Sequence, residues 1–159
     1  MKKILSALDK HIEEYCMVVL LAVMSVVIFA QVVSRYVFSN SISWSEEIAR
    51  YIFVWVVYFA ISYGVKVNAH VKVDAFITFM PNFMAKPIRI ISNFLFLVFC
   101  GLMMVYGVKV VDFILASKQS SPALGMPMGL VYLAVPVGFT LTAIRLVQDT
   151  IAKLKGKGE

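Results

Sequence analysis

Few groups that could perform chemistry are present in this sequence. It contains two histidines and two cysteines, and 15% of its residues are charged. A glycine-rich phosphate loop, a Walker lysine, a helical His-Glu-x-x-His pattern and a pair of cysteine metal ligands are all missing. His11 and His70 lie outside the long apolar stretches, so the axial ligands of a membrane cytochrome b are missing too. These absences predict a chain that is not an enzyme and that holds no cofactor or metal of its own.

Long blocks of basic residues are missing as well, although the formal net charge is +6. No run of Lys or Arg exceeds two residues, and no basic stripe alternates with aromatic residues, so we expect no nucleic-acid partner. Cys16 and Cys100 both lie in apolar stretches. This placement predicts buried thiols and argues against a disulfide framework or a metal cluster.

Apolar residues, in contrast, make up 61% of the chain, against about 45–50% in a soluble domain. A chain of this length cannot bury so much apolar surface in one globule, because small domains have little interior. Four apolar stretches are long enough to cross a hydrocarbon core about 30 Å thick. The sequence therefore predicts an all-α integral membrane protein with four transmembrane helices, a single membrane domain over residues 1–159, in contact with membrane lipids.

The predicted spans cover approximately residues 15–37, 43–67, 88–112 and 127–148. Pro87 comes just ahead of the third span, as is typical of a helix start. Pro136 lies inside the fourth span and predicts a kink there, which membrane helices tolerate.

The first residues, 2–14, have an amphipathic pattern and not a spanning one. Ile4 and Ile12 share one helical face, while Lys10 and Glu13 lie elsewhere. This pattern predicts an N-terminal interfacial amphipathic helix in the headgroup plane. The acidic residues ahead of the apolar stretch, and the lack of a small-x-small cleavage site, predict an uncleaved anchor and not a removable signal.

Lysine and arginine are distributed unequally between the two ends of the four spans. Of the fifteen such residues, the end without the termini carries four, namely Arg35, Arg50, Lys109 and Lys118, and the end with both termini carries the other eleven. Because connections rich in Lys and Arg stay in the cytoplasm, this asymmetry predicts cytoplasmic N- and C-termini. The outer connections are then residues 38–43 and 118–126.

Charged residues gather where the first span ends and the second begins. Glu46 lies four residues before Arg50, and Glu47 three residues before it, so both carboxylates could reach one guanidinium on the same helix face. Arg35 ends the first span, and a short hairpin would bring it close to them. The complete candidate cluster is Arg35, Trp44, Glu46, Glu47 and Arg50.

Three interpretations of this cluster remain open. It could be an interfacial salt-bridge network that pins the hairpin, with Trp44 as an ordinary membrane-interface anchor. It could be a docking surface for another subunit. It could also be a proton or ion relay like that of small four-helix drug exporters, but such exporters need a carboxylate in the middle of the membrane, and the four predicted spans have none there.

Weaker candidates lie in the connections. His70 and Asp74 are four residues apart after the second span, and they predict a surface hydrogen bond or, because imidazole titrates near neutrality, a pH switch. Pro122 belongs to a segment with two prolines and a glycine, residues 121–127, that leads into the fourth span. Such a segment most simply sets a turn and a helix start.

Four segments of the chain, in this order, resemble the small membrane (Q-type) subunit of tripartite ATP-independent periplasmic (TRAP) transporters. They are Ser34-Arg35-Tyr36-Val37-Phe38, then Trp44-Ser45-Glu46-Glu47-Ile48-Ala49-Arg50, then His70-Val71-x-Val73-Asp74, then Ser121-Pro122-Ala123-Leu124-Gly125-Met126-Pro127. The resemblance covers nearly the whole chain. Its most specific part is the Trp-Ser-Glu-Glu block placed after an Arg-Tyr-x-Phe helix end.

The resemblance implies a role that the residues alone do not reveal. In that family a large multi-span membrane subunit carries the substrate and sodium sites and moves, while the small subunit packs beside it as a fixed scaffold. A periplasmic binding protein delivers an organic acid such as sialic acid or a C4-dicarboxylate. The chain is therefore expected to be a non-catalytic scaffold subunit of a sodium-coupled importer in the bacterial inner membrane. The alternative is a self-sufficient homodimeric transporter of the small drug-exporter kind.

Overall fold

The structure, a computed structural model, describes residues 2–67 and 82–154. Helices make up most of this part: α1 (Lys2–Val37), α2 (Ser43–Lys66), α4 (Asn82–Ala116), α5 (Gly129–Tyr132) and α6 (Ala134–Leu154). Four stretches are long and apolar enough to cross a membrane: His11–Val37, Ser43–Lys66, Ile91–Ala116 and Gly129–Ile151. The predicted all-α fold with four membrane spans is confirmed.

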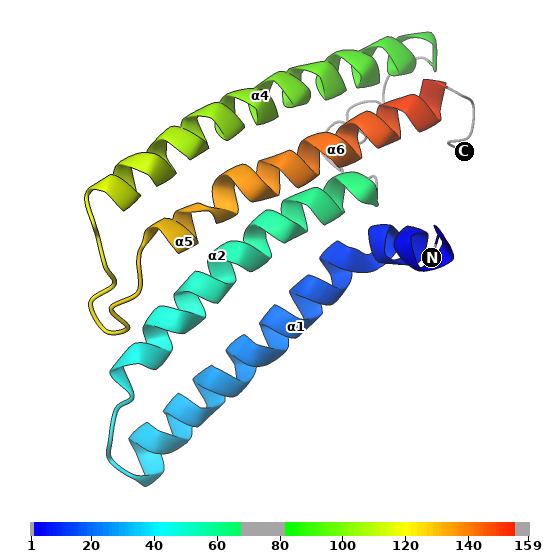
Figure 1. Cartoon of the computed structure of the whole chain (residues 1–159). Helices are drawn as coiled ribbons and strands as arrows, with labels where there is room; N and C mark the ends of the chain where they lie inside the picture. The colour runs from blue at the N-terminus through cyan, green and yellow to red at the C-terminus, as the bar shows by residue number, and fades with distance from the viewer. Residues whose placement is uncertain (1, 68–81, 155–159) are drawn as a thin grey trace.

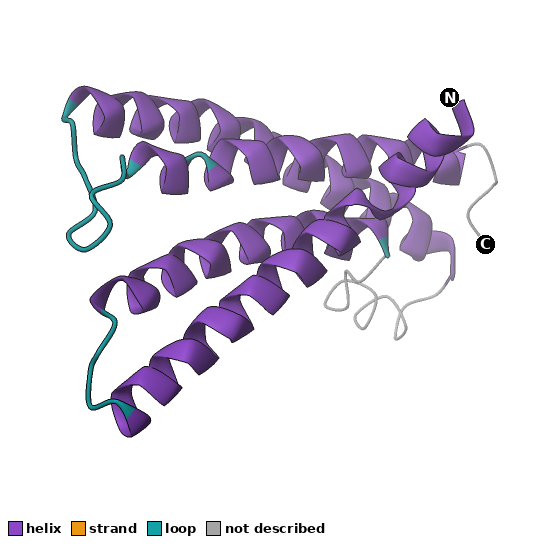
Figure 2. Cartoon of the chain, turned by 60° about the horizontal axis from the view of Figure 1, so that its bottom comes forward, coloured by secondary structure: helices purple, strands orange, loops and turns teal. Residues whose placement is uncertain are grey.

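The long helices stand side by side in a row, in the order α1, α2, α6, α4 (Figures 1 and 2). α2 and α6, which are far apart in the sequence, form the centre of this row, and α1 and α4 form its edges. The central helices are also more buried than the edges. Of the residues in the most apolar stretch of each span, 44% are buried in the fourth span and 28% in the second, against 17% in the third and 6% in the first. The edges therefore present most of their apolar side chains to lipid or to another chain.

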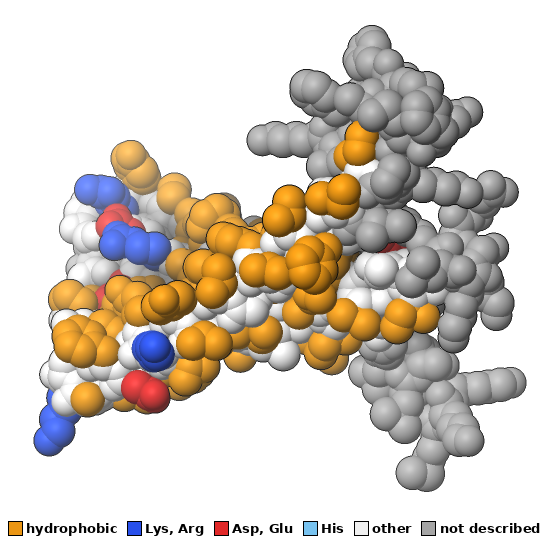
Figure 3. Space-filling view, turned by 90° about the horizontal axis from the view of Figure 1, so that it is seen from above, with side chains coloured by type: hydrophobic (Ala, Val, Ile, Leu, Met, Phe, Trp, Pro, Cys, Tyr) orange, Lys and Arg blue, Asp and Glu red, His pale blue; other side chains and the backbone are white. Residues whose placement is uncertain are grey.

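The two ends of the row hold different parts of the chain. The start of α1 and the end of α6 lie at one end, here named the termini end (Figure 1). The opposite end, here named the loop end, holds the α1–α2 connection and the α4–α5 connection. Hydrophobic side chains cover the middle of the molecule, and Lys, Arg, Asp and Glu side chains gather at the loop end (Figure 3).

Close contact between α2 and α6 depends on Gly138. A Cβ atom at this position would lie 2.5 Å from the Cβ atom of Tyr58, so glycine is needed for this approach. The neighbouring Phe139 is 6% exposed and packs edge-to-face on Tyr58 of α2 and on Phe99 of α4. The ring centroids are 5.8 Å and 5.6 Å apart, respectively. Phe139 thus joins three helices in one apolar core.

Two prolines mark where the predicted spans differ from the observed helices. α4 begins at Asn82, so Pro87 lies inside this helix and not ahead of it. The fourth span is interrupted, because α5 ends at Tyr132 and α6 begins at Ala134. The proline ring of Pro136 explains the interruption, since such a ring clashes with the carbonyl four residues earlier, here that of Tyr132, and donates no hydrogen bond to it.

The start of α1 differs in part from its prediction. Residues 2–14 continue directly into the rest of α1, although the first turns run at an angle to it (Figure 1). Glu13 does not lie on an outward polar face, because only 1% of this residue is exposed. An interfacial position for the first turns stays a prediction.

Candidate functional site

Glu47 lies near the start of α2 and binds the connection between α4 and α5. Its Oε2 atom accepts hydrogen bonds from the backbone N–H groups of Ala123, at 2.8 Å, and of Leu124, at 3.1 Å. Its Oε1 atom accepts a hydrogen bond from the hydroxyl group of Tyr51, one turn further along α2. A single carboxylate therefore satisfies two backbone donors of the loop and fixes the loop to α2.

The loop that Glu47 binds is folded by backbone hydrogen bonds of its own. Ser121 N donates to Met126 O at 2.9 Å, and Gly125 N donates to Ser121 O at 3.0 Å. Gly125 has a φ of 65°, a conformation that glycine adopts without a Cβ clash. Pro122 lies in the exposed turn between these residues. The predicted turn is therefore present, and its tip faces outward at the loop end.

Glu46 binds the other helix of the first hairpin. The side-chain amide of Gln31, on α1, donates to Glu46 Oε1 at 2.7 Å, and Gln31 is only 8% exposed. The connection between the helices is closed by Ser34, whose hydroxyl donates to the carbonyl of Asn40 at 2.7 Å. These contacts hold α1 against α2 at the loop end without an ion pair.

The arginines of the predicted cluster do not pair with these carboxylates. Within residues 2–67 and 82–154, the guanidinium groups of Arg35 and Arg50 have no carboxylate within 4.0 Å, and both residues are exposed. The predicted ion pairs of Glu46 and Glu47 with Arg50 are therefore wrong. An exposed ion pair contributes only about 0–1 kcal/mol, whereas the buried amide of Gln31 must find an acceptor, and Glu47 already accepts two hydrogen bonds from the loop backbone.

The predicted cluster is thus divided between two roles. Its carboxylates bind the loop backbone and the Gln31 amide, while the side chains of Arg35, Trp44 and Arg50 are exposed and bind no carboxylate of the described residues, Trp44 being exposed by 44%. The loop end is therefore a fixed surface that displays two guanidinium groups and an indole. Guanidinium groups form strong, often bidentate hydrogen bonds with carboxylates, so this surface suits an acidic partner. His70 and Asp74 lie outside the described residues.

A second charged cluster, which the sequence interpretation missed, lies at the termini end. The Glu13 carboxylate, on α1, accepts hydrogen bonds from Arg145 of α6, Nε at 2.6 Å and Nη2 at 3.1 Å. From α2, Lys66 Nζ lies 3.5 Å from this carboxylate and Ser62 Oγ donates to it at 3.3 Å. Arg145 also donates to Gln148 at 2.8 Å. We name these five residues the Glu13 cluster; three helices meet at one carboxylate whose side chain is 0% exposed.

One signal in the sequence could have revealed this cluster. Arg145 is the one charged residue within the predicted span 127–148, so it needed a partner of opposite charge. Helical periodicity assigns Glu13 to a face of its own helix, but it does not reveal which distant helix covers that face. Glu13 and Arg145 are 132 residues apart in the sequence.

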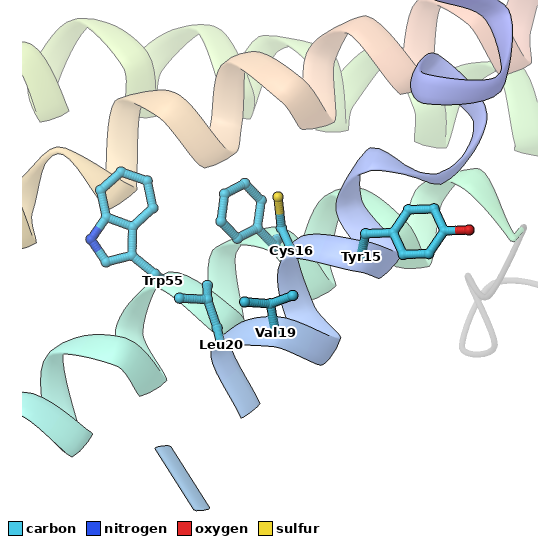
Figure 4. Close-up of a pocket in the computed structure, with 6 residues that line it drawn as sticks. Tyr15, Cys16, Val19, Leu20 and Trp55 are labelled. Carbon is cyan, nitrogen blue, oxygen red and sulfur yellow. The ribbon is translucent and has the colours of Figure 1, made fainter. Parts of the chain in front are cut away.

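An apolar groove lies between α1 and α2. Its volume is about 510 Å³, and it is lined by Tyr15, Cys16, Val19, Leu20, Trp55 and Phe59. Tyr15 points away from Leu20 and Trp55 (Figure 4). A site for a charged substrate needs converging polar groups, which these lining residues do not supply. Of the two predicted buried thiols, Cys100 is buried and Cys16, in this groove, is partly exposed.

Comparison with known proteins gives consistent matches. The model of the family described as tripartite ATP-independent periplasmic transporters, DctQ component, matches residues 24–156. A TRAP transporter small permease protein of Haemophilus influenzae is 31% identical over 97% of this chain and 94% of its own length. The isethionate TRAP transporter permease protein DctMQ of Oleidesulfovibrio alaskensis is 30% identical over 96% of this chain but 25% of its own length. The C4-dicarboxylate TRAP transporter small permease protein DctQ of Rhodobacter capsulatus is 34% identical over 66% of this chain and 46% of its own length.

Proposed function

This chain belongs to the family of DctQ components, the small membrane subunits of TRAP transporters, and we propose that it acts there as a fixed scaffold. It is a multi-pass inner-membrane protein and a component of a transporter, not an enzyme. In the full proposal it supports the large membrane subunit of a sodium-coupled importer, and a periplasmic binding protein delivers an organic acid.

The scaffold proposal is supported by what the carboxylates of Glu13, Glu46 and Glu47 bind. Ionisable groups that mark a transport pathway inside a membrane commonly face a water-filled cavity. Glu13, Glu46 and Glu47 instead join helices to each other or to a loop. Carboxylates that bind other parts of the same chain fix the helices and the loop relative to one another, as a scaffold requires.

The interruption between α5 and α6 does not change this proposal. Broken membrane helices can form binding sites, because their free backbone groups face a cavity. Here the N–H group of Leu133, between the two helices, bonds to carbonyls of α5, and Ala134 is 0% exposed. On the α4 side, Gly107 lies so close that a Cβ atom there would be 3.2 Å from Pro136. The interruption is therefore packed closely against α4 on this side.

A large membrane subunit is the partner of small subunits in this family. The match to about a quarter of the DctMQ relative agrees with such a partnership. On this chain the apolar edges formed by α1 and α4 offer the largest uncovered surfaces. We expect the large subunit to cover one of them.

The substrate is proposed to be an organic acid of the C4-dicarboxylate or sialic acid class. Relatives named for isethionate and for a C4-dicarboxylate match this chain at 30% and 34% identity. Similar small subunits therefore occur with different acids, which supports a site on other chains. The sodium sites are likewise expected on the large subunit.

The termini end is proposed to face the cytoplasm and the loop end the periplasm. Eleven of the fifteen Lys and Arg residues are on the termini side of the spans. In a cysteine-free background, a cysteine in place of Gln119 should react with a membrane-impermeant thiol reagent in intact cells, and one in place of Lys155 should not. The reverse labelling pattern would overturn this orientation.

For the candidate cluster we propose a division of labour. Glu46 and Glu47 hold the first hairpin and the α4–α5 loop, and Arg35 and Arg50 dock an acidic surface of the large subunit or of the binding protein. This combines the hairpin and docking interpretations. The family match does not favour the self-sufficient drug-exporter alternative.

Reconstitution tests the proposed function directly. Proteoliposomes are prepared with this chain alone, with its co-encoded large subunit alone, and with both, and sodium-dependent uptake is measured in the presence of the co-encoded binding protein. We expect uptake when both membrane subunits are present and none with this chain alone. Uptake by this chain alone would overturn the scaffold proposal.

A further inference from the structure

α1 is held in the structure in a way that differs from the other long helices. Its backbone packs on α2, and within the described residues it packs on no other helix. Its most apolar stretch is also the least buried of the four, at 6%. At the loop end the Gln31–Glu46 hydrogen bond and the short connection hold it on α2. At the termini end a different contact is needed to fix the position of α1 relative to the second hairpin, which consists of α4 and α6.

The Glu13 cluster provides this contact. Glu13 is on α1 and Arg145 is on α6, so their two hydrogen bonds cross the row from its edge to its centre. Both nitrogens come from one planar guanidinium, which fixes the orientation as well as the distance. The pair is almost fully covered, with 0% of the Glu13 side chain and 8% of the Arg145 side chain exposed. Little water therefore reaches either charge of this pair.

The members of the cluster on α2 add a bridge to this pair. Lys66 is 3.5 Å from the Glu13 carboxylate, and 21% of its side chain is exposed. Ser62 is 0% exposed and donates to the same carboxylate. The carboxylate therefore binds one side chain of α6, that of Arg145, and two side chains of α2, and these are the two central helices.

We propose that Glu13 is a positioning residue that locks the first hairpin, α1 and α2, to the second, α4 and α6, at the termini end. The lock acts through Arg145 and holds α1 in place relative to α6, on which the backbone of α1 does not pack. Without it, α1 keeps its hydrogen bond to α2 at the loop end and moves away from α6 at the termini end. This inference concerns contacts within the chain and does not depend on the transport role.

The test measures the distance between α1 and α6 at the termini end. Spin labels on cysteines placed at the exposed positions Ile12 and Ile151, in a cysteine-free background of the full chain, report this distance by pulsed electron paramagnetic resonance. We expect one narrow distance distribution in the parent and a longer, broader one in Glu13→Gln. The melting temperature should fall by on the order of 10 °C. Glu14→Gln is the matched control, because Glu14 is exposed and bonds to His11 on its own helix.

A double-mutant cycle separates a lock from a general loss of folding. Arg145→Gln should behave like Glu13→Gln, and the double variant should lose much less than the sum of the two, since either single variant already breaks the ion pair between them. If a single variant cannot be purified, recovery of folded protein in the double variant supports the same coupling. Additive losses in the cycle, an unchanged distance in Glu13→Gln, or an equal effect of Glu14→Gln would each overturn the proposal.

Discussion

The two ends of the helix row use carboxylates in opposite ways. At the loop end, Glu47 and Glu46 accept hydrogen bonds from neutral groups, the loop backbone and the Gln31 amide, and the nearby arginines stay exposed. At the termini end, Glu13 forms an ion pair with Arg145 that is almost fully covered. At these two sites the arginine pairs with a carboxylate where both charges are buried, and within the described residues it does not where the guanidinium is exposed. Where water reaches a guanidinium, its pairing contributes little, and backbone donors take the carboxylate.

Removal of the buried carboxylate should have the largest effect. Glu13→Ala removes the carboxylate that binds the covered guanidinium of Arg145, which also donates to Gln148. Breaking a buried pair in this way costs about 3–5 kcal/mol, which should appear as a loss of global stability in detergent or lipid. Chemical denaturation of the isolated chain measures it. A loss no larger than that of Glu14→Ala would show that the buried carboxylate stabilises the chain no more than the exposed one beside it.

Removal of the corresponding carboxylate at the loop end should have a local effect. Glu47→Ala takes away the acceptor of the Ala123 and Leu124 N–H groups, so the loop should detach from α2. Hydrogen exchange of these two amides should become markedly faster, while exchange in the middle of α6 stays slow. Tyr51→Phe is the control, since it removes one donor to Glu47 and leaves the loop bonds in place. Equal acceleration in α6 would show that the loop end is not an independent unit.

A smaller loss is expected at the hydrogen bond between the first two helices. Gln31→Leu removes the amide that donates to Glu46 and fills the same buried position with an apolar side chain. The expected cost is about 0.5–1.5 kcal/mol, the range of a single hydrogen bond. The free energy of unfolding from chemical denaturation checks this value. A cost equal to that of Glu13→Ala would mean that α1 is held as strongly at one end as at the other.

The exposed arginines should matter least for stability and most for partners. Arg50→Ala and Arg35→Ala should change the stability of the isolated chain by about 0–1 kcal/mol, because neither forms an ion pair in the described chain. If the proposed docking role holds, co-purification of the large subunit or uptake should fall, and Arg50→Glu should have a larger effect than Arg50→Ala. Normal uptake and normal co-purification in Arg50→Glu would leave this side chain without a role in docking.

Local properties of the sequence predicted much of the fold. The number of spans follows from the length of the apolar stretches, and the interruption near Pro136 follows from the chemistry of one residue. The partners of the carboxylates could not be predicted in the same way. Spacing within α2 favoured Arg50 for Glu47, but the loop that binds Glu47 is 76 residues away. A local pattern shows which groups are near in sequence, and the competition with distant donors is decided only by the packed structure.

The order of the helices in the row also constrains how the chain is made. Synthesis proceeds from the N-terminus, so α1 and α2 enter the membrane first and α4 enters next. The neighbour of α4 in the row is α6, and α6 is also the second neighbour of α2. Until α6 has been inserted, the long helices of the described residues are therefore the hairpin of α1 and α2, and α4, which packs on neither of them. α6 packs on both α2 and α4, so a chain terminated before α6 should reach the membrane proteases with α4 linked to the first hairpin by the chain but not packed against it.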